Sequence, residues 1–175
     1  THTRVDNLEF GPYYRWDKSV TPLVEAFPPG FRMIAASNDP GTCGVGDNSC
    51  NDGNFVAMFT ECCDFTNNGG ERCNSWEGGL FFPRQNCDFV GIALAMPTCW
   101  DGRIDSPDHK SHMAYTVDGQ VNGDCPASHS RRLPQVQVFI RIPNYRGVEF
   151  EYVLSDGNRI PGSNGAWNFH TDFFN

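Results

Sequence analysis

The sequence is poor in basic residues. Thirteen Lys and Arg stand against 21 Asp and Glu, which gives a net charge of −8 at pH 7. Binding to nucleic-acid phosphates depends on clustered Lys and Arg, and Arg131–Arg132 is the one adjacent basic pair. The charge balance therefore argues against a nucleic-acid ligand.

Several patterns that mark common protein classes are also missing. There is no Gly-x-Ser-x-Gly elbow of a serine hydrolase and no Gly-x-x-x-x-Gly-Lys loop for phosphate. No apolar run approaches the ~18 residues of a membrane-spanning helix, and no helical periodicity lasts beyond about two turns. We therefore expect no membrane span and few long helices.

Cysteine, by contrast, is abundant, with eight residues in 175. No Cys-x-x-Cys pair occurs, so the pattern favours a disulfide framework over metal thiolates and indicates an oxidising, extracellular setting. Cys62 and Cys63 are adjacent, and we expect them to take different partners because a bridge between neighbours strains the peptide. The one pairing that we predict is Cys99 with Cys125, which would close the polar loop between them.

Composition and patterning predict an all-β protein. The chain has the size of a single domain, 1–175, and its 18 Gly and 12 Pro indicate many turns. Short runs between turn signals predict strands at 31–36, 135–142 and 148–154. The continuous apolar runs 54–59 and 89–96 suit strands buried on both faces or short buried helices. We expect a disulfide-stapled β-sandwich or jelly-roll-like domain with long loops.

The run 135–142 is the clearest strand. Its alternation places one apolar set of side chains on a single face, and 143–147 would turn the chain into 148–154 to form a hairpin. We predict that the buried face consists of Val136, Val138, Ile140 and Ile142.

Ionisable side chains concentrate in residues 99–112. Three carboxylates and two of the five histidines fall within these fourteen residues. A neutral imidazole can accept a proton or a metal near neutral pH, so this stretch is the candidate site. The candidate catalytic residues are Asp105, Asp108, His109 and His112; the candidate substrate-binding residues are Trp100, Asp101, His129, Arg131 and His170.

Three interpretations of this stretch stay open. His109 and His112 with Asp105 or Asp108 could bind a metal if the loop is helical. Two of its aspartates could flank a glycosidic bond, with Trp100 stacked on the sugar. Alternatively, the aspartates hold a turn around Pro107 and the histidines bond to the backbone. The sequence identifies no cofactor and leaves catalysis undecided.

These residues also carry a family resemblance. Cys-Trp-Asp-Gly at 99–102, Asp-Ser-Pro-Asp-His-Lys-Ser-His at 105–112, and the segments 27–34 and 125–135 resemble a large family of secreted, mainly fungal proteins. That family is catalogued as a domain of unknown function, number nineteen ninety-six, and its members are often joined to small carbohydrate-binding modules. His170-Thr171-Asp172 is similar to its usual His-x-Asp ending. The usual His-x-His segment at the start has no match here, so we expect a processed or partial piece of a longer chain.

Two functions follow as hypotheses. The resemblance, with the aromatic and carboxylate content, implies a secreted domain that binds or acts on carbohydrate of a cell wall or matrix. The alternative is a structural, self-associating extracellular protein. A concave surface that collects Trp100, Asp105, His109 and His112 would favour the first, whereas a broad exposed apolar face with this loop buried would favour the second.

Overall fold

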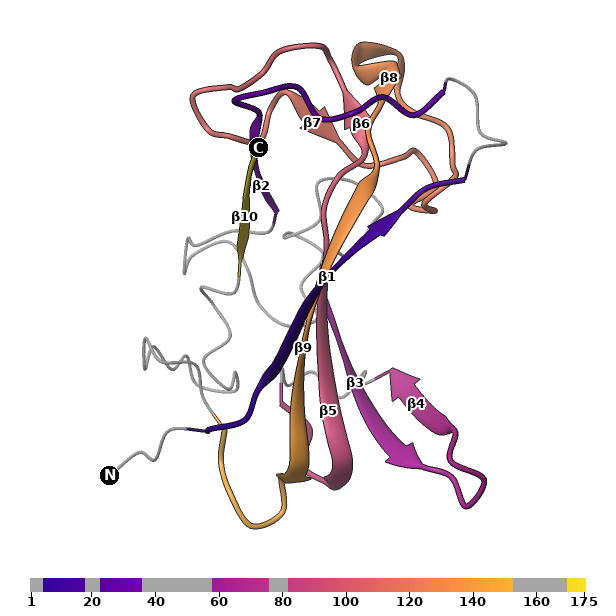
Figure 1. Cartoon of the computed structure of the whole chain (residues 1–175), viewed down its shortest axis with the longest axis vertical. Coiled ribbons are helices and arrows are strands. Elements are labelled where there is room, and N and C mark those ends of the chain that lie inside the picture. Colours follow the sequence, from indigo (N-terminus) through magenta and orange to yellow (C-terminus); the bar gives the residue numbers. More distant parts are fainter. Residues whose placement is uncertain (1–4, 18–22, 36–57, 76–81, 153–169) are drawn as a thin grey trace.

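The computed structural model describes residues 5–17, 23–35, 58–75, 82–152 and 170–175. Within these ranges the regular structure is almost wholly β, with one short 3-10 helix (Figure 1). The predicted all-β, disulfide-stapled class is confirmed. Cys43, Cys50 and part of the apolar run 54–59 lie outside the described residues.

The strands form three antiparallel sheets. A five-stranded sheet has the order β1-β9-β5-β3-β4, and the smaller sheets β10-β2 and β7-β6-β8 lie toward its upper end in Figure 1. The elements are β1 (Glu9–Arg15), β2 (Arg32–Ala35), β3 (Met58–Phe65), β4 (Glu71–Ser75), β5 (Asn86–Ala95), β6 (Cys99–Trp100), β7 (Met113–Ala114), the 3-10 helix Ala127–His129, β8 (Arg131–Arg132), β9 (Gln135–Arg146) and β10 (Thr171–Phe174).

Strand β9 confirms the period-two prediction. Val136 and Ile142 are buried, while Val138 and Ile140 are half-buried and pack on the core. Opposite residues of paired strands share a face, and the register pairs even-numbered residues of β9 with even-numbered residues of β1 and β5. Along Val136–Ile142 the even-numbered face therefore covers the core and the odd-numbered face is the outer one, whereas beyond Asn144 the odd-numbered Tyr145 and its partner Cys87 are buried.

The predicted hairpin between 135–142 and 148–154 is wrong. Strand β9 does not turn at Pro143 but continues to Arg146, still paired with β5. Residues 147–149 form a turn and 150–152 have no strand partner, whereas 153 and 154 lie outside the described residues. Pairing with β5 outweighs the local turn signal of Pro143-Asn144. Asn144 keeps its place in the strand with a positive φ of 52°, a conformation that asparagine adopts more readily than most residues.

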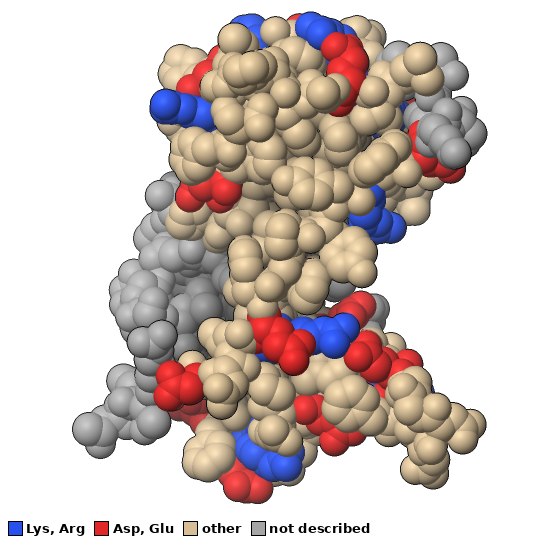
Figure 2. Space-filling view, in the orientation of Figure 1, with Lys and Arg blue, Asp and Glu red and all other residues tan. Residues whose placement is uncertain are grey.

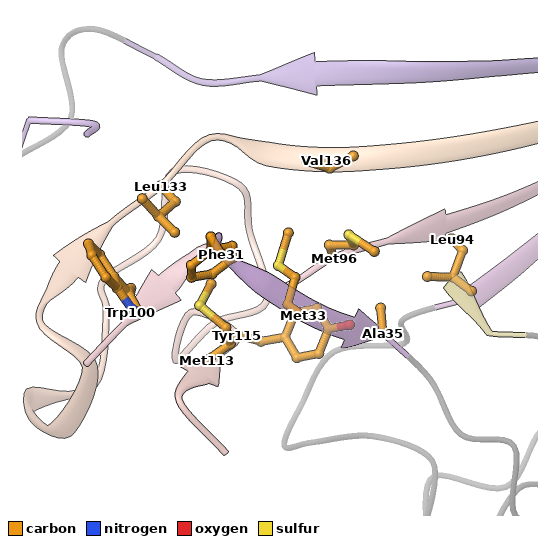
Figure 3. Close-up of a cluster of buried hydrophobic side chains, with 10 residues drawn as sticks. All are labelled: Phe31, Met33, Ala35, Leu94, Met96, Trp100, Met113, Tyr115, Leu133 and Val136. Atoms are coloured by element: carbon orange, nitrogen blue, oxygen red, sulfur yellow. The ribbon is translucent and has the colours of Figure 1, made fainter. Parts of the chain in front are cut away.

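The core divides into two clusters. The first lies where the two small sheets meet the large one, with Phe31 at its centre (Figure 3). The second lies under the other end of β5 and β9, around Val90, Ile142 and Tyr145. Burial raises the pKa of the Tyr145 hydroxyl, which donates a hydrogen bond of 2.6 Å to the carbonyl of Pro83. The hydroxyl therefore stays protonated in the core.

Three disulfides staple these elements. Cys99 is bonded to Cys125, as predicted. The adjacent Cys62 and Cys63 take different partners, Cys87 and Cys73. No described cysteine is free. Two bridges therefore tie the β3–β5 end of the large sheet, and the third closes the polar loop that carries the candidate site.

Candidate functional site

The loop between β6 and β7 is fixed at both ends. Cys99 and Trp100 pair with Ala114 and Met113 on one side and with β8 on the other. The disulfide between Cys99 and Cys125 holds the same strand. Backbone N–H groups of Arg32 and Ile34 donate to the carbonyls of Ile104 and His109 at 3.2 and 2.9 Å. Two backbone hydrogen bonds therefore fasten the loop to β2.

His112 lies inside the protein, with an exposed fraction of 0%. Its ring packs edge-on against Phe31, with the centroids 5.3 Å apart. Nε2 lies 2.7 Å from the backbone carbonyl of Arg32, which can only accept, so Nε2 carries the proton. Burial lowers the pKa of the imidazole, and it outweighs the hydrogen bond to that carbonyl, which raises the pKa. The expectation of an accessible His112 is therefore wrong.

The other nitrogen of His112 begins a polar chain. Nδ1 lies 2.8 Å from Oγ of Ser106, and that oxygen lies 2.7 Å from Oδ1 of Asp108, so the one hydroxyl proton is shared between the neutral imidazole and the carboxylate. The same carboxylate oxygen accepts the backbone N–H groups of Lys110 and Ser111. The hydrogen bond from Ser106 and those amides hold the pKa of Asp108 well below its usual range.

Ser106, His112 and Asp108 have the composition of a hydrolytic triad but not its geometry. In such a triad the imidazole stands between serine and carboxylate, and its second nitrogen can remove the serine proton. Here the serine stands between the other two, is buried, and the histidine uses Nε2 on a backbone carbonyl. This arrangement fixes the loop to β2 and leaves the hydroxyl without access to a substrate.

His109 points away from His112. Its Nδ1 lies 2.6 Å from Oδ1 of Asp105, and both side chains are partly exposed. The hydrogen bond from His109 lowers the pKa of Asp105, and the nearby charge of Arg32 acts in the same direction. The backbone of His109 has a positive φ of 53°, which turns its side chain outward from a tight loop. Asp105 and His109 thus form a surface pair beside β2.

Four predicted binding residues gather at the opposite end of the loop. The guanidinium of Arg131 lies 4.0 Å from the centroid of the buried Trp100 ring and forms two hydrogen bonds to Glu25. Partial burial raises the pKa of Asp101, but the hydrogen bonds from Arg103 outweigh it and lower the pKa overall. His129 lies near enough to Asp101 to lower its pKa further. Trp100 is therefore covered by Arg131 and presents no free face.

His170 lies on β2's other side. It precedes β10, where Asp172 is placed opposite Ile34, and its Nε2 lies 3.6 Å from Oδ2 of Asp172. The structure therefore separates the predicted residues into a buried chain, a surface pair beside β2, a cluster at Trp100 and a pair on β10. The four candidate catalytic residues share no accessible surface, because His112 is buried while Asp105 and His109 are partly exposed. Their catalytic role stays a prediction.

The predicted metal ligands do not converge in the described part of the chain. The one described group of three potential ligand atoms within 4.8 Å of one another is Glu61, Cys63 and Cys73. Cys63 and Cys73 are bonded to each other, so neither offers a thiolate. His109 and His112 share no such group, because one faces solvent and the other the core.

Exposed aromatic side chains form a feature that the sequence analysis did not assign to a site. Phe10, Tyr13, Tyr14 and Trp16 expose 68, 59, 52 and 58% of their surface, and three of them lie on the edge strand β1. Their density in 10–16 was visible in the sequence. The signal was ambiguous because aromatic residues in a strand are usually buried.

One comparison with known proteins gives a match. Residues 1–175 match the model of a family described as Domain of unknown function (DUF1996). No curated protein and no solved structure matches the chain. In the described residues, no helix is long and apolar enough to cross a membrane.

Proposed function

We propose that this chain, which belongs to the DUF1996 family, is a secreted domain that binds carbohydrate of an extracellular matrix or cell wall. Three disulfides fit the oxidising conditions outside the cell. The observation that carries the proposal is the aromatic surface on the outer face of the large sheet, where the rings of Tyr13 on β1 and Phe65 on β3 are exposed to solvent.

The physical basis is the match between aromatic rings and sugars. A pyranose has an apolar face of C–H groups and a polar rim of hydroxyls. Tyr and Trp combine an apolar ring with a hydrogen-bonding tip, which suits them to surfaces that are half apolar and half wet. Exposing such rings to water is unfavourable, and exposed apolar surface marks interaction sites in folded proteins.

The site is thereby different from the one that the sequence indicated. Trp100 is covered by Arg131 and His112 is buried. We therefore assign the 99–112 loop a role in the stability of the fold and place the sugar elsewhere. Strand β1 lies at the edge of the large sheet, where a long polymer could reach it without entering a pocket.

The test is retention of the purified protein on insoluble polysaccharides. Cellulose, chitin and β-1,3-glucan, each as a suspension, should deplete the protein from solution for at least one polymer. Bovine serum albumin serves as the control for non-specific adsorption. No depletion by any of these polymers, with the disulfides shown intact by mass spectrometry, would contradict the proposal.

Self-association is the second candidate, since the same exposed edge strand favours it. A strand at a sheet edge is a template for pairing with another chain. β1 contains Pro12, which lacks an N–H and is one of the residues that protect edges from such pairing. Sedimentation velocity separates the two candidates: a monomer over a wide concentration range favours carbohydrate binding, and concentration-dependent dimers favour assembly.

A further inference from the structure

The outer face of the five-stranded sheet carries a diagonal row of aromatic rings. The Tyr13 and Phe139 centroids are 5.7 Å apart, and those of Phe89 and Phe65 are 5.6 Å apart. All four residues have odd numbers in the strands β1, β9, β5 and β3, so they share the outer face. Phe89 is buried on this face, where Arg141 and Phe65 pack against it. Tyr13 and Phe65 expose 59 and 60% at the two ends.

Arg141 joins the two halves of the row. Its guanidinium carbon lies 4.6 Å from the centroid of Phe89 and 5.9 Å from that of Phe139. It also donates two hydrogen bonds to the carboxylate of Glu71, at 3.1 and 3.2 Å. A guanidinium on an aromatic face is a stabilising contact, and the carboxylate fixes its plane. The row is therefore continuous, with Arg141 between one pair of rings, Tyr13 and Phe139, and the other, Phe89 and Phe65.

Glycines keep this face low. Gly11 lies beneath the Phe139 ring, because an added Cβ would meet that ring at 2.7 Å. Gly91 lies between Arg141 and Glu61 in the ladder, and an added Cβ would meet nothing nearer than 3.9 Å. A Cβ at Gly91 would make only ordinary contacts with Glu61 and Phe89, so the absence of a side chain leaves a shallow floor beside the row.

The charges of this face are balanced. Arg141 is paired with Glu71, and Arg15 donates to the side-chain oxygen of Gln137 at 2.9 Å. In Figure 2, basic and acidic side chains lie against one another on the lower half of the visible surface. Glu9 and Glu61 belong to the same face by register, and the whole chain carries −8. A polyanion would be repelled here.

We infer that this outer face, from Tyr13 through Phe139 and Arg141 to Phe65, binds a neutral, extended polysaccharide that lies diagonally across the strands. The inference rests on the proposed function and gives it a site and a ligand class. Each step along the row is comparable to the length of one hexose unit. Rings at both ends stack on sugar faces, and the floor at Gly91 admits a flat chain. In the central pair the Arg141 guanidinium donates hydrogen bonds to sugar hydroxyls, and the Glu71 carboxylate accepts hydrogen bonds from them.

The opposite face of β1 offers the matched control. Tyr14 is one residue from Tyr13 and exposes 52%, yet it lies opposite Val136 on the even-numbered face. Removing either ring deletes the same chemical group from the same strand. Only the loss of Tyr13 touches the outer row.

The test uses the whole chain and soluble oligosaccharides of cellulose, chitin and β-1,3-glucan in isothermal titration calorimetry, with oligogalacturonate as the anionic probe. Tyr13→Ala and Phe65→Ala should each weaken the neutral ligand about fivefold to tenfold, since one stacked ring is lost. Tyr14→Ala should leave the affinity unchanged. Gly91→Ala should weaken binding by raising the floor, because an added Cβ meets no atom nearer than 3.9 Å and the sheet can keep its shape.

The outcomes distinguish the site from the function. If the unaltered protein binds a neutral oligosaccharide but Tyr14→Ala weakens it and Tyr13→Ala does not, the outer-face site is overturned and the proposed function stands. If oligogalacturonate binds more tightly than the neutral probes, the ligand class is overturned. If the unaltered protein binds none of these oligosaccharides, both the outer-face site and the proposed function are overturned. Circular dichroism of each variant checks that the sheet is intact, and a second ring variant, Phe139→Leu, replaces any that does not fold.

Discussion

His112, in the loop before β7, donates from Nε2 to the backbone carbonyl of Arg32 in β2 at 2.7 Å, across 80 residues of sequence. Nδ1 of the same ring contacts Ser106, and through it Asp108. One imidazole thereby fastens the disulfide-closed loop to β2 and, with Phe31, closes the first core cluster. The histidines that suggested chemistry in the sequence have different tasks in the structure.

The substitution His112→Ala should destabilise the protein by about 2–4 kcal/mol, because it opens a cavity and leaves a buried carbonyl without a donor. Urea unfolding followed by Trp fluorescence measures the change. His109→Ala removes a partly exposed ring paired only at the surface, so it should cost less than about 1 kcal/mol. Equal costs for the two variants would contradict the assignment of His112 to the core.

Acid should weaken the fold through Asp108. Its pKa is lower in the folded protein than in the unfolded chain, so its contribution to stability is fully present above the unfolded pKa of about 3.9 and is lost as the pH falls below it. The free energy of unfolding of Asp108→Asn should therefore be lower than that of the parent at neutral pH. Its decline below about pH 4 should also be shallower, which unfolding curves at a series of pH values can measure.

The buried imidazole adds a second acid-sensitive step. Burial lowers the pKa of His112, so the folded state favours the neutral ring and loses stability as the pH falls below the unfolded value of about 6.5. His112→Gln should flatten the stability profile below about pH 6.5 relative to the parent protein. Chemical denaturation at half-unit pH steps gives the comparison.

Removing the Cys99–Cys125 bridge should destabilise the loop end of the molecule. The two residues are 26 apart, and a closed loop of that size stabilises a fold by roughly 3–4 kcal/mol in the chain-entropy model. The double variant Cys99→Ala, Cys125→Ala avoids a free thiol. Thermal unfolding should show a lower Tm, and an unchanged Tm would contradict the prediction.

Val138→Asp tests the inner face of β9. Val138 packs on the first core cluster, and an unpaired carboxylate there should cost several kcal/mol and reduce secretion. Gln137→Asp is the matched control, because Gln137 lies on the outer face and its oxygen accepts from Arg15, as a carboxylate can. If Val138→Asp were secreted with the Tm of the parent, the inner-face assignment would be wrong.

The sequence by itself determined the class of the fold and much of its framework. Period-two apolar alternation in 135–142 fixed which side chains face the core, because a strand presents alternate residues to opposite faces. Adjacent Cys62 and Cys63 had to take different partners, and the loop between Cys99 and Cys125 closed as expected. These features depend on local geometry, which the order of residues specifies.

Tertiary structure alone decided where strands end and which side chains meet. β9 passes through Pro143 because its ladder with β5 outweighs a local turn. His109 and His112 diverge because the loop takes a positive φ at His109 while the carbonyl of Arg32 draws His112 inward. The outer row from Tyr13 to Phe65 exists only because the register brings four strands together. Such relations depend on long-range pairing, on which a single stretch of sequence carries no information.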